Sequence, residues 1–131
     1  MAKRATASEP NNFVLIIDDD PLIARLLSHW LTQRGYDVEI INNGKSAIEN
    51  LETQKPPRLI FLDIMMPLAD GFEVLTQIKA RKKWKKVPII MLTSKSSEDS
   101  IVRAFESGVD DYVTKPFKPG ELLVRMNRLL N

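Results

Sequence analysis

Three consecutive carboxylates, Asp18, Asp19 and Asp20, follow the apolar run 14–17. At an effective dielectric constant near 20, two like charges about 5 Å apart repel by roughly 3 kcal/mol. A fourth carboxylate, Asp63, also follows an apolar run. Carboxylates without nitrogen or sulfur ligands suit a hard divalent cation, and Mg²⁺ fits best because it tolerates a few carboxylates and retains waters. The sequence therefore predicts a magnesium site in which the cation offsets the repulsion.

Two further polar side chains, Thr93 and Lys115, follow apolar runs later in the chain. Together, the carboxylates, a hydroxyl, an ammonium group and a divalent cation are suited to phosphoryl transfer. A carboxylate attacks phosphorus, while the cation and the ammonium group stabilise charge on the equatorial oxygens. This chemistry requires a fold that brings four separate segments to one place.

The order of the expected elements supplies such a fold. Short apolar runs alternate with helical patterns, which indicates a parallel sheet covered on both faces. We predict an α/β fold with a doubly wound five-stranded parallel sheet of order 2-1-3-4-5, flavodoxin-like and of the (βα)5 type. The strands are expected at residues 13–17, 37–41, 58–62, 87–92 and 111–114. The helices are expected from 21 to about 34, 45–53, 72–82, 96–107 and 119–130.

In this strand order the first and third strands are neighbours, about 4.8 Å apart. Ligands bind beyond their carboxyl ends, where the winding reverses. Asp18, Asp19 and Asp63 should therefore converge there. Asp20 is expected only to cap the first helix before Pro21. Ser96, with Asp99 three residues later, is expected to cap the fourth helix.

Length and composition limit the remaining possibilities. The 131 residues suffice for one domain, which we expect over residues 13–131 after a flexible tail over 1–12. The absence of cysteine excludes disulfides and thiolate metal sites. The single histidine, His29, excludes a multi-histidine cluster and is expected on a helix surface. No apolar run approaches the about eighteen residues of a membrane span, and the N-terminus lacks a signal-peptide pattern, so we expect a cytoplasmic protein with no membrane association.

The basic residues are concentrated in one segment. KARKKWKK, residues 79–86, holds six of the 19 Lys and Arg residues, so the remainder of a chain with net charge +2 carries −4. The segment precedes the fourth strand and lies at the end of the sheet opposite Asp63. We interpret it as a solvated helix end rather than a docking patch, and expect no direct binding of nucleic acid by this domain.

Four segments, IIDDDP, LDIMMPLADG, IIMLTS and DYVTKPF, resemble the signatures of the response-regulator receiver domain of two-component signalling. The spacings match as well, with 45 residues from Asp18 to Asp63, 30 from there to Thr93 and 22 to Lys115. The resemblance extends over residues 13–130. Any one of these signatures is weak evidence, whereas four in register are strong.

The resemblance implies a role for each site residue. Asp63 would accept a phosphoryl group from a phosphohistidine on a histidine kinase or histidine phosphotransfer protein. Asp18, Asp19, Asp63 and the backbone carbonyl of Met65 would hold Mg²⁺. Lys115 would contact the phosphoryl group, and the Lys115–Pro116 bond would be cis. The protein would promote its own phosphorylation and dephosphorylation, and would not turn over an external substrate.

The resemblance also implies a conformational switch. Thr93 would turn inward to the phosphoryl group, and Tyr112 would rotate from exposed to buried. The surface of the fourth helix, fifth strand and fifth helix would then change and contact an effector or a second copy. Intermolecular ion pairs there would come from Asp110, Asp111, Glu121, Arg125 and Arg128. The winged-helix transcription-factor branch of the family usually has Lys or Arg in the fourth helix, facing Glu121. This chain has Ile101, which is expected to be exposed for an apolar contact.

Three alternatives remain at this stage. A phosphorylation-independent interaction module would keep the fold without the chemistry. A phosphatase similar to the haloacid dehalogenases would also use an aspartate nucleophile and magnesium, but that family needs a second Asp two residues later, where this chain has Met65. A flavin-binding electron carrier would need a Ser-, Thr- and Gly-rich phosphate loop after the first strand, where this chain has acids.

Overall fold

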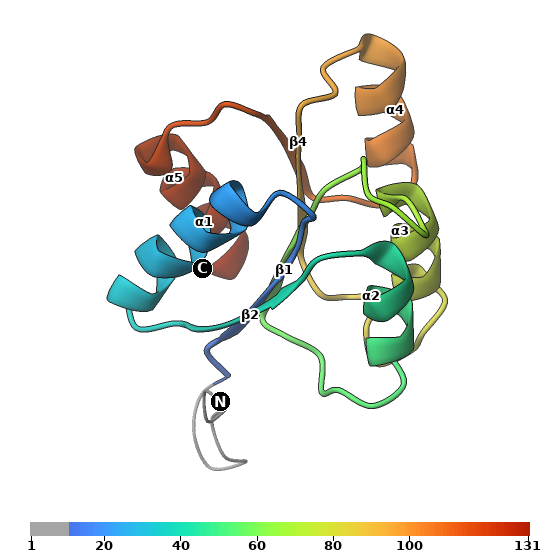
Figure 1. The fold of residues 1–131 in the computed structure, drawn as a ribbon, viewed down its shortest axis with the longest axis horizontal. Coiled ribbons are helices and arrows are strands. Elements are labelled where there is room, and N and C mark those ends of the chain that lie inside the picture. Colours follow the sequence, from blue (N-terminus) through green and yellow to red (C-terminus); the bar gives the residue numbers. More distant parts are fainter. Residues whose placement is uncertain (1–10) are drawn as a thin grey trace.

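The computed structural model describes residues 11–131 and contains a five-stranded parallel sheet of order β2-β1-β3-β4-β5 (Figure 1). This confirms the predicted fold class. The strands are buried on both faces, except at the edge strand β2, as expected for a doubly wound sheet. Their bounds are β1 Phe13–Ile17, β2 Asp37–Ile41, β3 Leu59–Leu62, β4 Ile89–Thr93 and β5 Asp111–Thr114.

Four helices connect successive strands, a fifth follows the last strand, and together they cover both faces of the sheet. In Figure 1, α1 and α5 lie on one side, and α2, α3 and α4 lie on the other. The bounds are α1 Pro21–Gln33, α2 Gly44–Asn50, α3 Gly71–Lys79, α4 Glu98–Glu106 and α5 Pro119–Leu130. All the β-to-α connections therefore lie at the carboxyl edge of the sheet.

Successive side chains of each strand point to opposite faces of the sheet, so the apolar core has two layers. In β1, Phe13, Leu15 and Ile17 join the core beneath α2, α3 and α4, whereas Val14 and Ile16 join the core beneath α1 and α5. This is the two-residue period of strand side chains. Both layers are tightly filled, which fixes the strand ends that carry the polar residues.

The register aligns the ends of neighbouring strands. Ile17 pairs with Leu62, Leu62 pairs with Met91, and Thr93 pairs with Thr114. The residues that follow each strand therefore project from a common edge.

Several predicted boundaries were wrong. The cap of α4 is Ser97, not Ser96, and its hydroxyl accepts from the backbone N–H of Ser100 at 3.2 Å. The helix α2 begins at Gly44 and ends at Asn50, and α3 begins at Gly71 and ends at Lys79. Both end earlier than predicted because the next residues form hydrogen-bonded turns.

Two leucines of α1, Leu22 and Leu26, lie outside the core, because their side chains are 72% and 53% exposed. The predicted tail, residues 1–12, falls largely outside the described residues. Within the described part of the chain, no helix combines the length and the apolar character needed to cross a bilayer.

Candidate functional site

Three carboxylates converge at the carboxyl edge of β1 and β3. Asp18 and Asp63 are 3% and 5% exposed, whereas Asp19 faces solvent. One carboxylate oxygen of each lies within 4.8 Å of the other two. Pairing of β1 with β3 produces this arrangement, because Ile17 and Leu62 are in register and the acids follow them directly.

Local hydrogen bonds orient the segment after β1. The backbone N–H of Asp20 donates to Asp18 Oδ1 at 2.9 Å, which holds the Asp18 side chain inward. Asp20 itself accepts from the backbone N–H groups of Leu22 and Ile23 at 3.0 and 3.3 Å. Asp20 therefore caps α1, as predicted, and does not join the carboxylate cluster.

Lys115 reaches the cluster from the loop after β5. Its ammonium Nζ lies 2.8 Å from Asp18 Oδ2 and 3.5 Å from Asp63 Oδ2. The Lys115–Pro116 peptide bond is cis, as the family resemblance implies. The backbone N–H of Lys115 donates to the carbonyl of Thr93 at 2.9 Å, which ties this loop to the end of β4.

Burial and neighbouring charges act in opposite directions on the pKa values of Asp18 and Lys115. Burial raises the pKa of Asp18 from 3.8 to about 6, and the charge of Asp63 adds to this rise, although Lys115 opposes it. Burial alone would lower the pKa of Lys115, but the hydrogen bond and charge of Asp18, with the charge of Asp63, outweigh it and raise that pKa. Lys115 therefore stays protonated and provides a fixed positive charge beside two buried acids.

These residues fit a divalent cation. They offer only carboxylate oxygens, the ligands that Mg²⁺ prefers, and one carboxylate is exposed, which leaves the cluster open to water. A single ammonium group does not balance three carboxylates, so a net negative charge remains at the site. The donor set thus agrees with the magnesium prediction.

The expected switch residues lie on the neighbouring strands. Thr93 is fully buried at the end of β4, and its Oγ1 accepts from the backbone N–H of Lys95 at 3.3 Å. Tyr112 is 9% exposed, and its hydroxyl donates to the carbonyl of Lys95. The resemblance implies an exposed and a buried orientation of Tyr112, and in this structure the side chain is buried. Burial and the charge of Asp63 both raise the pKa of Tyr112.

The loop between β3 and α3 closes the site. The backbone N–H of Met65 donates to Asp63 Oδ1 at 3.4 Å, and the Met65 side chain is 54% exposed. Leu68 in this loop has φ of 73°, in the left-handed region. A Cβ on Gly71 would lie 2.3 Å from the carbonyl oxygen of Asp63, so only glycine allows α3 to begin so close to Asp63.

Sequence reasoning missed a second contact to this loop. A Cβ on Gly44, the first residue of α2, would lie 1.9 Å from the carbonyl oxygen of Ala69. The start of α2 thus abuts the loop that follows Asp63. The Asn43-Gly44 pair is a turn signal in the sequence, and a turn signal carries no information about packing against a distant loop.

The residues expected to make intermolecular ion pairs are bonded within the chain. Asp111 is buried and accepts from Arg125 Nη1 at 2.9 Å and from Arg128 Nη2 at 3.3 Å. Arg125 also pairs with Glu121 at 3.2 Å, and Asp111 raises the pKa of Arg125 through a hydrogen bond and its charge.

The remaining predictions at this surface concern Asp110 and Ile101. Asp110 accepts from the backbone N–H of Ile89 at 2.8 Å, so it fastens the start of β4. The expectation of an exposed Ile101 was wrong, because its side chain is half-buried and packs against the core beneath α4. The exposed apolar side chains of α4 are instead Val102 and Phe105, each 47% exposed. His29 is exposed on α1, as expected.

Comparisons with known proteins agree with this geometry. The family model of the response regulator receiver domain matches residues 14–127. The alkaline phosphatase synthesis transcriptional regulatory protein PhoP of Bacillus subtilis is 42% identical over 120 residues, which are 92% of this chain and 49% of PhoP. The chain thus spans about half the length of the curated relatives it matches.

Solved structures give the same result. The chemotaxis protein CheY4 of Vibrio cholerae superposes with a TM-score of 0.84 at 30% identity, over 92% of this chain and 100% of that one. The receiver domain of a sensor histidine kinase of Pseudomonas aeruginosa, with a magnesium ion coordinated in its active site cleft, has a TM-score of 0.82 at 28% identity. The superposition with the kinase domain covers 92% of this chain and 98% of that one. The chain therefore belongs to the response regulator receiver domain family of two-component systems.

Proposed function

We propose that this protein is a phosphorylation-dependent signalling switch that accepts a phosphoryl group on Asp63 from a phosphohistidine of a histidine kinase or histidine phosphotransfer protein. The observation that carries the proposal is the position of the Asp63 carboxylate. It is buried, 3.5 Å from the Lys115 ammonium, and clustered with Asp18 and Asp19. A structural carboxylate at a strand end would not need two further acids and a buried cation around it.

The transfer step follows from this arrangement. An oxygen of Asp63 attacks phosphorus, the new P–O bond forms, and the P–N bond breaks with its electron pair returning to the imidazole. Lys115 neutralises charge on the phosphoryl oxygens, and the Thr93 hydroxyl donates to one of them. Dephosphorylation would reuse the same groups: water attacks phosphorus, the P–O bond to Asp63 breaks, and inorganic phosphate leaves as the carboxylate is restored. The protein would thus promote its own phosphorylation and dephosphorylation and act on no external substrate.

Asp18, Asp19, Asp63 and the backbone carbonyl of Met65 are the groups that would hold Mg²⁺. When bound, the cation supplies positive charge that lowers the repulsion between the carboxylates and the incoming phosphoryl group. The magnesium ion coordinated in the receiver domain of the Pseudomonas kinase supports this part of the proposal.

The output of the switch is the surface of α4, β5 and α5. Once Thr93 engages the phosphoryl group, the buried orientation of Tyr112 is favoured, and this surface takes the form that binds an effector or a second copy. The name of PhoP, a transcriptional regulatory protein of about twice this length, supports an effector that acts on DNA in the cytoplasm. Residues 13–131 would form the receiver unit of such a protein.

Labelling by acetyl phosphate with Mg²⁺ tests the assignment of Asp63. Wild type should gain the mass of one phosphoryl group, held in an acyl phosphate that hydroxylamine cleaves. Asp63→Asn should gain none. Asp99→Asn removes an exposed carboxylate in the first turn of α4 and serves as the matched control, which should be labelled as wild type is.

The possible outcomes separate the alternatives. Equal labelling of wild type and Asp63→Asn would mean that another residue is the acceptor. Absence of labelling in wild type, with either acetyl phosphate or a phosphorylated histidine phosphotransfer protein, would favour the phosphorylation-independent interaction module.

A further inference from the structure

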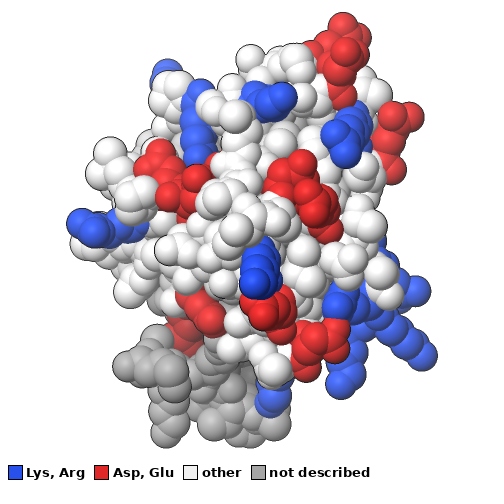
Figure 2. Space-filling view, turned by 45° about the vertical axis from the view of Figure 1, so that its right-hand side comes forward, with Lys and Arg blue, Asp and Glu red and all other residues white. Residues whose placement is uncertain are grey.

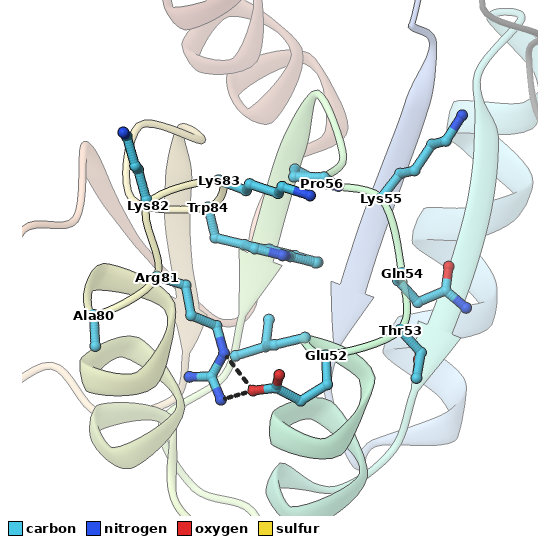
Figure 3. Close-up of a pocket in the computed structure, with 11 residues that line it drawn as sticks. Glu52, Thr53, Gln54, Lys55, Pro56, Ala80, Arg81, Lys82, Lys83 and Trp84 are labelled. Carbon is cyan, nitrogen blue, oxygen red and sulfur yellow. Dashed lines mark hydrogen bonds and ion pairs between the residues drawn. The ribbon is translucent and has the colours of Figure 1, made fainter.

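A hollow of about 620 Å³ lies at the end of the molecule opposite the phosphoacceptor site (Figure 3). It is bordered by the segment that leads from α2 to β3 and by the turn between α3 and β4, and it is open to solvent. Lys55, Lys82 and Lys83 stand on its rim, where the Lys83 side chain reaches across the hollow and those of Lys55 and Lys82 extend outward (Figure 3). Leu51 and Trp84, 5% and 2% exposed, close its base, and half-buried Pro56 lies beside them. We call this feature the lysine-rimmed hollow. Its volume falls within the range of about 300–1,000 Å³ that is usual for ligand pockets.

Charge is strongly segregated at this end of the molecule. Residues 79–86 hold six Lys and Arg residues and no acid, whereas the rest of the chain carries −4. Figure 2 shows a group of Lys and Arg side chains that project from the lower right of the molecule, with acidic side chains dispersed over the remaining visible face. A surface of this kind attracts a partner of opposite charge and speeds its encounter.

An ion pair neutralises the one acid of the hollow. Arg81 Nε donates to Glu52 Oε1 at 3.0 Å, and Arg81 Nη1 donates to the carbonyl and to the side-chain oxygen of Gln77, both at 2.9 Å. Arg81 is therefore fully engaged within the chain. Among residues 11–131, no carboxylate forms an ion pair with Lys55, Lys82 or Lys83, so the rim keeps its positive charge.

The turn that carries the lysines is rigid. Trp84 is only 2% exposed and belongs to the core beneath α2, α3 and α4. Its backbone N–H donates to the carbonyl of Arg81 at 3.0 Å, and the N–H groups of Lys85 and Val87 close two further turns at 2.9 and 3.0 Å. A rigid backbone loses less conformational entropy on binding than a flexible one. The backbone that carries Lys82 and Lys83 is therefore preorganised for a ligand.

The sequence alone favours a solvated helix end for residues 79–86, but α3 ends at Lys79 and the basic residues after it lie on a turn beside this hollow. We therefore propose that the lysine-rimmed hollow is a docking site for an acidic polypeptide segment that also carries apolar side chains. Carboxylates of such a segment would meet the lysine rim, and an apolar side chain would enter the hollow and pack against Pro56 and the methylene groups of Lys83.

Nucleic acid fits the hollow less well. The phosphates of a duplex lie on a convex cylinder, which would touch the ammonium groups and leave the hollow empty. A single strand would need an exposed ring for base stacking, but Trp84 is buried. Arginine, the residue that binds phosphate with two parallel hydrogen bonds, is present here only as Arg81, which is already paired.

The docking site is separate from the phosphoacceptor site. Pro56 precedes β3 and Asp63 follows it, so the two ends lie roughly 20 Å apart along an extended strand. A partner bound at the hollow would leave Asp63 accessible. The site would therefore recruit or retain a partner while phosphotransfer proceeds at the other edge of the sheet.

Isothermal titration calorimetry with a peptide of repeated Glu-Glu-Leu triplets tests the proposal on the full chain. Wild type should bind with a saturable isotherm that weakens as salt rises. Lys82→Glu with Lys83→Glu should weaken binding by about tenfold or more, because both side chains border the hollow. Lys85→Glu with Lys86→Glu makes the same change in net charge outside the lining, and should weaken binding by no more than about threefold.

Two further ligands complete the test. A peptide in which serine replaces leucine should bind more weakly than the Glu-Glu-Leu peptide, because the hollow gains no apolar side chain. A DNA duplex should bind more weakly than the peptide and should not distinguish the two double variants. If a charge-reversed variant melts early, the pair Lys82→Gln with Lys83→Gln replaces it.

Four results would overturn the proposal. They are no binding of the peptide, equal losses in the two double variants, equal affinity of the serine peptide, and tighter binding of the duplex. Acetyl phosphate labelling of the same variants should match wild type, so failure at the hollow and failure of the Asp63 assignment remain distinguishable.

Discussion

Asp18 is buried 2.8 Å from the Lys115 ammonium, yet burial and the charge of Asp63 hold its pKa at about 6. The folded metal-free protein therefore binds a proton at Asp18 between pH 3.8 and about 6, where the unfolded chain does not. Because the folded state binds more protons in this window, the free energy of unfolding falls as the pH rises through it. Asp18 thus lowers stability at neutral pH.

Magnesium binding should depend on pH through the same group. The cation needs the ionised carboxylate, so its affinity should fall by about tenfold for each pH unit below 6 and level off above it. Calorimetric titration of Mg²⁺ from pH 4.5 to 8 measures this profile. Asp18→Asn should bind the cation weakly and without the step near 6. A flat profile in wild type would show that Asp18 stays ionised throughout.

A second residue-level feature is the backbone at Leu68. Its φ of 73° places a residue with a Cβ in the left-handed region, and its side chain is 74% exposed. Asn tolerates this region better than Leu. We expect Leu68→Asn to raise the free energy of unfolding by about 0.5–1 kcal/mol, measured by urea denaturation. Leu22→Asn is the control, because Leu22 is equally exposed but helical, and it should be neutral or slightly destabilising.

At the scale of elements, the start of α2 fixes the loop that follows Asp63. Gly44→Ala would force its new methyl group against the carbonyl oxygen of Ala69. We expect a loss of about 1–3 kcal/mol in the free energy of unfolding, together with weaker Mg²⁺ binding, because the displaced loop carries Met65.

Gly120→Ala provides the matched control for this substitution. A Cβ at Gly120 in α5 meets nothing within 4 Å, so the substitution should stabilise the protein by about 0.5–1 kcal/mol and leave Mg²⁺ affinity unchanged. Equal stability of the two variants in urea denaturation would contradict the role given to Gly44.

The sequence predicted best those elements at whose two ends a polar, proline or glycine residue interrupts the apolar pattern. The strands at 13–17, 37–41 and 111–114 and the helix at 119–130 have the predicted bounds. The end of α2 was misplaced because residues 51–53 continue with hydrogen bonds to the third preceding residue, for example from Thr53 to Asn50 at 3.2 Å. Apolar periodicity does not distinguish such turns from a helix.

The site was predictable to a similar degree. Strand order alone brings Asp18, Asp19 and Asp63 together and places Lys115 at the same edge, and the resemblance adds the role of each residue. The sequence does not show that Lys115 lies closer to Asp18 than to Asp63, since that depends on side-chain packing. Nor does it show that Asp111 binds Arg125 within the chain, because a partner molecule would satisfy the same charges.

At the scale of the whole molecule, the carboxylate cluster is a source of instability that a bound cation should remove. A cation held by this cluster would bind the folded state alone, so Mg²⁺ at about one hundred times its dissociation constant should add about 2.7 kcal/mol to the free energy of unfolding at pH 7. Thermal melts in MgCl₂ and in NaCl of equal ionic strength measure this gain. The gain should be lost in Asp63→Asn, and its persistence there would place the cation elsewhere.

Trp84 also serves as an intrinsic optical reporter for the basic end of the molecule. The chain has two tryptophans, and the other, Trp30, lies on α1 beneath the Arg34 guanidinium. With Trp30→Phe, all indole emission would arise from Trp84, at the floor of the lysine-rimmed hollow. Because Trp84 is 2% exposed, its emission should already be that of a buried indole in the free protein, so a red shift would report that the base of the hollow has opened, whereas chemistry at Asp63 would leave the spectrum unchanged.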